Sequence, residues 1–128
     1  MKTLKILGVV ILVSAAFVAG AATALIRGWG DRAVSAEMVN KLEQPIRSFT
    51  VRYTTCGTKT EITSGELPPG KSRTIRFWVC GEGASVVEAT LADGTIVRGP
   101  ELYVESGYST TSTVNTMGIV STQRMYAL

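Results

Sequence analysis

The sequence predicts an all-β protein: a small immunoglobulin-like antiparallel sandwich preceded by one N-terminal hydrophobic helix. Residues 4–26 form a long apolar run in which Lys5 is the only charge. From Ile46 onward, Thr, Val, Ile, Tyr and Arg alternate and are interrupted at short intervals by turn residues, a pattern typical of strands with one buried face. Two cysteines suit a small exported domain held by one disulfide. The predicted segments are 1–26, 27–44 and 45–128.

The apolar run is long enough for a membrane-spanning helix. At about 1.5 Å per residue it would reach roughly 35 Å, which covers a hydrocarbon core of about 30 Å. Residues 1–26 are therefore predicted to be a transmembrane anchor or a signal peptide, and the small residues 22–24 suit cleavage. Lys2 and Lys5 favour a cytoplasmic N-terminus, and Trp29 is expected at the membrane interface. The C-terminal domain would then lie in the periplasm, anchored in the inner membrane by a single pass or secreted after signal cleavage.

Residues 27–44 are predicted to be a juxtamembrane linker that contains a short helix. Val34, Met38 and Leu42 recur at a spacing of four, which would place them on one face of a helix. Pro45 would end this helix, because proline cannot continue the helical hydrogen bonding. The β domain would then begin at residue 45.

Turn signals divide the chain beyond residue 45 into short strands. Residues 67–70, Leu-Pro-Pro-Gly, fit a type II turn, and Asp93-Gly94 is a strong hairpin signal. The predicted strands are 46–55, 59–64, 72–80, 85–92, 95–99, 101–105, 108–115 and 119–126. This density of short strands predicts an immunoglobulin-like sandwich, with a small barrel as the alternative.

The composition argues against several classes of function. The chain has no histidine, which excludes Ser-His and Cys-His catalysis and the commonest kind of zinc site. Its net charge is +3, but beyond residue 44 eight basic residues are balanced by seven acidic ones, so nucleic-acid binding has no support. We therefore predict a non-enzymatic protein with no catalytic residue, no cofactor and no metal.

Cys56 and Cys80 are predicted to form a structural disulfide. Each lies at the end of a predicted strand and precedes a glycine. An even number of cysteines in an exported domain favours a disulfide. By the alternation of a strand, Cys56 shares a face with Arg52 and Cys80 shares a face with Arg76. The bridge is therefore expected to join neighbouring strands at an edge or loop instead of crossing the core.

Two groups of residues are candidates for a binding surface. Arg52 and Arg76 would form a basic patch for a carboxylate or phosphate if their strands are neighbours. If they are not, each is a solvated side chain with a glutamate nearby. Tyr103, Glu105 and Tyr108 flank a turn and could form a binding edge for a protein or a glycan. In the alternative, Tyr103 packs in the core and Tyr108 closes a corner of the sandwich.

Several segments of the β region carry a resemblance to known proteins. They are residues 67–86, with Pro-Pro-Gly and Gly-Glu-Gly, then Asp93-Gly94-Thr95, and residues 103–108. Over the C-terminal two-thirds of the chain, these segments resemble small exported β-sandwich proteins of uncharacterised role in Gram-negative bacteria. The resemblance implies a fold and an exported location, and it implies no catalytic or binding residue.

These observations predict a membrane-anchored periplasmic domain. It would bind another envelope protein or serve as an accessory subunit of an envelope complex, and its N-terminal helix would hold it to the membrane. The alternative is a periplasmic inhibitor or immunity protein that blocks an enzyme such as a cell-wall hydrolase. A small, rigid, disulfide-linked domain is a suitable scaffold for either role.

Overall fold

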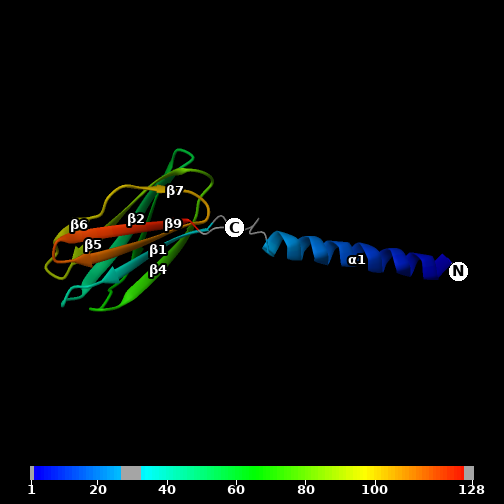
Figure 1. The fold of residues 1–128 in the computed structure, drawn as a ribbon, viewed down its shortest axis with the longest axis horizontal. Coiled ribbons are helices and arrows are strands. Elements are labelled where there is room, and N and C mark those ends of the chain that lie inside the picture. Colours follow the sequence, from blue (N-terminus) through cyan, green and yellow to red (C-terminus); the bar gives the residue numbers. More distant parts are fainter. Residues whose placement is uncertain (1, 27–32, 126–128) are drawn as a thin grey trace. The chain divides into compact units, whose positions relative to one another are not determined.

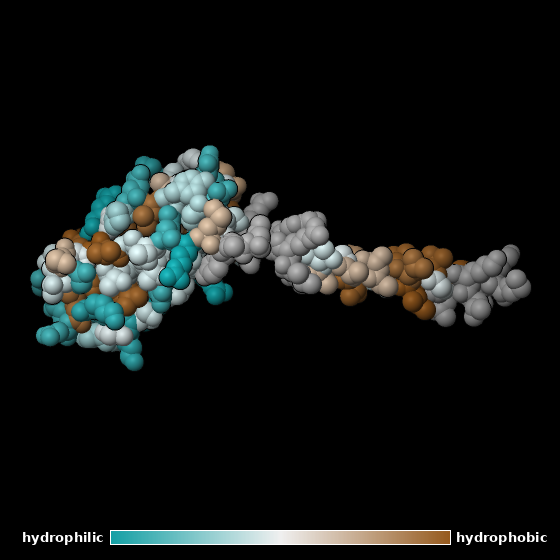
Figure 2. Space-filling view, viewed as in Figure 1, coloured by the Kyte–Doolittle hydropathy of each residue, from teal (hydrophilic) through white to brown (hydrophobic). Residues whose placement is uncertain are grey.

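The computed structural model describes residues 2–26 and 33–125 (Figure 1). Helix α1 spans Lys2–Ile26, and the strands belong to a separate compact unit. Side chains of α1 such as Val13 and Phe17 are exposed, and Figure 2 shows hydrophobic residues on its surface. In the described part of the chain, no helix combines the length and the apolar character that crossing a membrane requires.

Strand β1, Ala33–Asn40, lies where the sequence predicted a linker helix. Its buried residues alternate and include Val34, Ala36 and Met38. A spacing of four residues puts Val34 and Met38 on the same face of a strand as well as of a helix. Because the intervening Ala36 is small, the period of two is weak in the sequence. The helix prediction for 27–44 is therefore wrong over the strand, and the β unit begins before residue 45.

The eight strands predicted beyond residue 45 are all present, each with ends within two residues of the expected ones. Their alternation of buried and exposed positions follows the sequence pattern, since one face of each sheet packs inward. The strands are β2 (Ile46–Thr55), β3 (Thr58–Ser64), β4 (Ser72–Trp78), β5 (Gly83–Leu91), β6 (Ile96–Arg98), β7 (Leu102–Val104), β8 (Tyr108–Asn115) and β9 (Gly118–Met125).

The nine strands of the described residues form two sheets. Sheet A has the order β4-β1-β8-β9, and sheet B has the order β3-β2-β5-β6, with β7 also paired to β5. The pairing of β1 with β8 is parallel, whereas the other pairings are antiparallel. The described structure is thus mainly β, as predicted, with one N-terminal helix.

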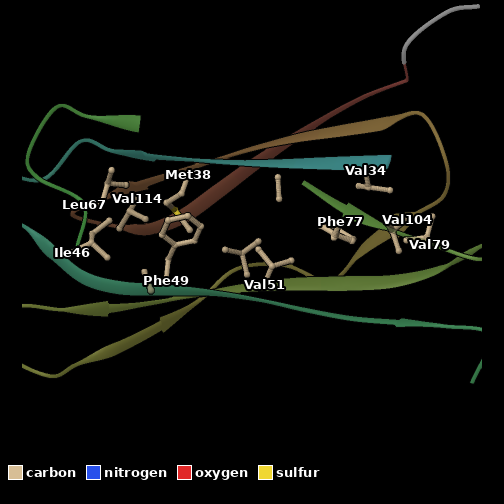
Figure 3. Packing of buried hydrophobic residues seen from close by; sticks show 13 residues of the cluster. Val34, Met38, Ile46, Phe49, Val51, Leu67, Phe77, Val79, Val104 and Val114 are labelled. Atoms are coloured by element: carbon tan, nitrogen blue, oxygen red, sulfur yellow. The ribbon is translucent and has the colours of Figure 1, made fainter. Parts of the chain in front are cut away.

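Buried side chains from both sheets form one hydrophobic core (Figure 3). Met38 of β1 and Val114 of β8 belong to sheet A, and Phe49 and Val51 of β2 belong to sheet B. The ring of Tyr53 on β2 stacks on Phe77 of β4, with centroids 4.3 Å apart. The two sheets therefore stabilise each other by burying their apolar faces together.

Asn40 is a fully buried amide at the end of β1. Its Nδ2 donates to the carbonyls of Gln44 and Leu67, both at 3.0 Å, and its Oδ1 accepts from the Leu42 N–H at 2.9 Å. Among the described residues, no buried side-chain nitrogen or oxygen lacks a hydrogen-bond partner. Asn40 therefore fastens the two loops that follow β1 and precede β4 to the core.

Both predicted turns are present. The N–H of Lys71 donates to the Pro68 carbonyl at 3.2 Å, and Gly70 between them has a φ of 71°, as the second central position of a type II turn requires. In the other turn, Gly94 has a φ of 89° and the Asp93 carboxylate accepts from the Thr95 N–H at 2.8 Å. In both turns the glycine has the positive φ that the turn requires, as the sequence predicts.

Cys56 and Cys80 form the predicted disulfide, with their Cα atoms 6.2 Å apart. Cys56 follows β2 of sheet B and Cys80 follows β4 of sheet A, and both residues are exposed. The bridge lies in loops, as expected, but the expectation that it joins neighbouring strands is wrong. It links the two sheets at one end, so it constrains how they are held together.

Candidate functional site

Arg52 and Arg76 lie on different sheets, so the prediction that they form one basic patch is wrong. Arg52 belongs to β2 of sheet B, whereas Arg76 belongs to β4 of sheet A and faces Ser35 of β1. Both side chains are exposed, as strand alternation indicated. Alternation places a side chain on a face, but it does not say which strands become neighbours.

Arg52 is instead part of a row of alternating charges on the outer face of sheet B. Its Nε lies 2.7 Å from Glu61 Oε2, and its Nη1 lies 2.7 Å from the Glu88 carboxylate. Arg98 continues the row, with Nη1 3.7 Å from Glu88 Oε1. The hydrogen bond with Glu61, followed by the charges of Glu61 and Glu88, raises the pKa of Arg52. The row therefore holds a charged guanidinium in a fixed position between two carboxylates.

A hollow of about 560 Å³ lies on the same face, beside this row. Val86 and Ala84 of β5 contribute apolar surface to it, since they pair with the outward-facing Arg52 and Thr54 of β2. Val86 is only 7% exposed although it is not part of the core. The lining residues are Arg52, Tyr53, Thr54, Lys59, Thr60, Glu61, Ala84, Ser85, Val86, Arg98 and Glu101.

One side of the hollow is shaped by a break in the edge of sheet B. Strands β6 and β7 both pair with β5, and the Gly99 N–H donates to the Val87 carbonyl between them. Pro100 follows, and it has no N–H with which to continue the ladder. Residues 99–101 therefore interrupt the edge between β6 and β7, and both Arg98, the last residue of β6, and Glu101 line the hollow beside this break.

Tyr103 lies beside the hollow, on β7, and it is exposed rather than buried in the core. The residue is 42% exposed, and its ring meets the ring of Tyr108 edge-on, with centroids 5.4 Å apart. Its hydroxyl donates to Glu105 Oε2 at 2.8 Å and lies 3.2 Å from Glu82 Oε2. The alternative in which Tyr103 packs in the core is wrong, and the three residues predicted as a binding edge are brought together.

The two carboxylates also change the acidity of Tyr103. The hydrogen bond to Glu105 is the largest cause that raises the pKa of its phenol, and the charges of Glu105 and Glu82 add to it. The side-chain amide of Gln123 on β9 donates to the backbone carbonyl of Tyr103. The phenol therefore keeps its proton for the hydrogen bond to Glu105, and both its hydroxyl and its backbone are held. We call Glu82, Tyr103, Glu105 and Tyr108 the tyrosine edge.

Sequence reasoning missed the partners that complete both surfaces. Glu82 belongs to the tyrosine edge, and Glu88, Arg98 and Lys59 belong to the charge row and the hollow. For Glu88, Arg98 and Lys59 the only signal is the alternation of their strands, which puts them on an outer face, whereas Glu82 precedes β5 and has no such signal. Their cross-strand neighbours depend on sheet order and register, which a single sequence does not specify.

The remaining predictions concern Trp29 and the binding of a metal ion. Trp29, predicted at a membrane interface, lies outside the described residues. In residues 2–26 and 33–125, no group of three or more Cys, Asp or Glu side chains is arranged to hold a metal ion. Glu61 and Glu88 are engaged with Arg52, and Glu105 is engaged with Tyr103.

Comparisons with known proteins support the fold alone. No family model matches the chain, and no curated protein matches it. Among solved structures, the chain is similar to a protein from Eubacterium rectale determined by NMR, with 13% identity over 77% of this chain and 93% of that chain and a TM-score of 0.51. A Gram-negative toxin shows 11% identity over 74% of this chain and 23% of that one, with a TM-score of 0.36. This structural similarity is too low to support a conclusion about the fold.

Proposed function

We propose that this protein is a non-enzymatic binding domain of the cell envelope, which attaches to another envelope protein through the tyrosine edge. The observation that carries the proposal is the position of Tyr103. An aromatic side chain that is 42% exposed yet hydrogen-bonded to Glu105 is available for a partner and already held in place. Tyrosine is among the residues enriched at protein interfaces and at their energetic centres.

The geometry favours a partner with an exposed arginine or lysine. Tyr103 and Tyr108 offer aromatic surface, and Glu82 and Glu105 offer carboxylate oxygens beside it. The side chain of an arginine or lysine can contact an aromatic ring and at the same time donate charge-assisted hydrogen bonds to neighbouring carboxylates. Because Tyr103 is already held by its hydroxyl, little conformational entropy is lost when a partner binds.

The proposed location rests on the N-terminal segment. Its apolar sequence follows a short basic start, which is how exported leaders begin. A periplasmic location, with the segment kept as an inner-membrane anchor or removed as a signal peptide, agrees with the exposed disulfide, because disulfides persist in oxidising compartments. The finer fold assignment, an immunoglobulin-like sandwich, belongs to the proposal and is supported by the single core between two sheets.

The test is site-specific crosslinking in living cells. A photo-crosslinking residue replaces Tyr108, at the tyrosine edge, or Thr74, an exposed position on the edge strand β4 of the same sheet, as the matched control. We expect one crosslinked envelope protein from position 108 and none from position 74. Glu105→Lys should abolish this product, because it replaces attraction to a cation by repulsion. Equal products from both positions, or a product that survives Glu105→Lys, would contradict the proposal.

Mass spectrometry of the recovered protein's N-terminus decides between the two proposed roles. An intact leader together with a membrane-protein partner supports an anchored accessory domain. A mature N-terminus close to residue 25, with a single soluble enzyme as partner, contradicts that role and favours the inhibitor alternative. The two results differ in both the N-terminus and the partner, so they cannot be confused.

A further inference from the structure

The hollow on the outer face of sheet B forms a second surface that the tyrosine edge does not use. Its lining comes from β2, β3, β5 and the segment around Glu101, whereas Tyr103, Tyr108, Glu82 and Glu105 do not line it. Its volume of about 560 Å³ lies within the range of roughly 300 to 1,000 Å³ that is typical of small-ligand sites. The charge, hydrogen-bonding groups and apolar surface of its lining indicate the class of ligand that it binds.

The charges around the hollow balance. Arg52, Lys59 and Arg98 line it with Glu61 and Glu101, and Glu88 forms an ion pair with Arg52 beneath them. This arrangement gives three positive and three negative side chains. Arg52 is neutralised at short distance by two carboxylates, so it offers little attraction to an added anion. The hollow is therefore polar without a net charge that would select an anion or a cation.

Hydrogen-bonding groups of both kinds remain open around the hollow. The guanidinium of Arg98 has its nearest carboxylate oxygen at 3.7 Å, beyond hydrogen-bond distance, so its N–H groups remain free for a ligand. Glu101 and the hydroxyl of Thr54 supply acceptors on the same lining. A ligand rich in hydroxyl groups suits this mixture, since each hydroxyl both donates and accepts a hydrogen bond.

The floor of the hollow is apolar. Val86 and Ala84 are neighbours on one face of β5, two residues apart; Arg52 lies beside Val86, and Ala84 lies between Thr54 and Tyr103. Sugars present hydroxyls at the edge of the ring and C–H groups on its face, so an apolar floor inside a polar rim matches their shape. A phosphate or a free carboxylate would leave that floor unused.

From the balanced charge, the open donors and acceptors and the apolar floor, we infer that the hollow binds a short uncharged oligosaccharide. The sugar face lies over Ala84, next to the small exposed part of Val86, and Arg98 and Glu101 bond its hydroxyls. Arg52 is a positioning residue that keeps Glu61 and Glu88 in place. The hollow adjoins the tyrosine edge, since Tyr103 is the cross-strand neighbour of Ala84, but its ligand is a sugar and not a protein, so different probes test the two proposals.

The test is an NMR titration of the isotopically labelled full chain, kept in a detergent that has no sugar headgroup. The probes are the trimer of N-acetylglucosamine and maltotriose, with inorganic phosphate as the anionic comparison. We expect one or both oligosaccharides to shift backbone amides of β2, β3 and β5 around the hollow, with millimolar or tighter affinity. Shifts confined to the tyrosine edge, or shifts of the hollow by phosphate and by neither oligosaccharide, would overturn the inference.

Two variants localise the binding. Ala84→Leu fills the floor and should abolish the oligosaccharide shifts, whereas Thr74→Leu, the same kind of addition on the outer face of sheet A, should leave them unchanged. Arg98→Ala, at a largely exposed side chain, should weaken binding about tenfold, the effect of losing a charge-assisted hydrogen bond. Affinity that is unchanged in both Ala84→Leu and Arg98→Ala would place the sugar elsewhere and refute the assignment.

Discussion

Asn40 and Tyr103 show how local partners override the general affinity of a side chain for water or for the core. Asn40 is polar, yet it is fully buried because its amide has two acceptors and one donor within hydrogen-bond distance. Tyr103 is aromatic, yet it is exposed because Glu105 and Glu82 hold its hydroxyl at the surface. Hydropathy alone predicts the reverse for both residues.

At the residue scale, Asn40→Ala should destabilise the protein by about 2 to 4 kcal/mol. The substitution leaves the carbonyls of Gln44 and Leu67 without this donor and the Leu42 N–H without its acceptor, and buried groups that lose a partner cost roughly 1 to 3 kcal/mol each. Urea unfolding measures the change. Asn115→Ala is the control, because Asn115 makes one exposed turn bond to Met117 and should cost under about 1 kcal/mol. Equal losses would contradict the role assigned to Asn40.

At the scale of elements, β1 has the largest consequence for the architecture. It pairs with β4 on one side and with β8 on the other, so it lies inside sheet A. The parallel pairing of β1 with β8 joins segments that are more than seventy residues apart. An amphipathic pattern that suits both a helix and a strand becomes a strand here because two neighbours satisfy its backbone groups.

The position of β1 predicts that Met38→Ala destabilises the fold by about 2 to 5 kcal/mol, because it removes a side chain that is 1% exposed from the shared core. Val39→Thr is the matched control, since Val39 lies on the outer face of the same strand and should change stability by less than about 1 kcal/mol. Urea unfolding of the two variants measures both effects. If residues 33–40 were a linker outside the core, the two variants would unfold alike.

At the scale of the whole β unit, the disulfide connects the two sheets at one end. It joins the turn after β2 to the segment after β4, and these strands belong to different sheets. The β unit is small, and domains of this size bury a lower fraction of their surface than larger ones. A covalent link that restricts the unfolded chain is therefore a substantial part of its stability.

Replacing both cysteines, Cys56→Ser with Cys80→Ser, should lower the free energy of unfolding by about 3 to 4 kcal/mol, the chain-entropy effect of opening a loop of this length. Urea unfolding of the double variant measures the loss, and reduction of the unmodified protein is the control that should reproduce it. An unfolding midpoint that does not move in either sample would show that the bridge does not stabilise the domain.

The all-β class, the eight strands beyond residue 45, the turns at Gly70 and Gly94 and the pairing of Cys56 with Cys80 all follow from the sequence by itself. They depend on chain-local properties: alternation, turn chemistry and cysteine count. Only the tertiary structure decided that β1 is a strand, that Arg52 and Arg76 lie on opposite sheets, and that Tyr103 meets Glu82 at the surface. These outcomes depend on which strands become neighbours and in what register. That choice is made by the packing of two apolar faces into one core, to which residues from the whole β unit contribute.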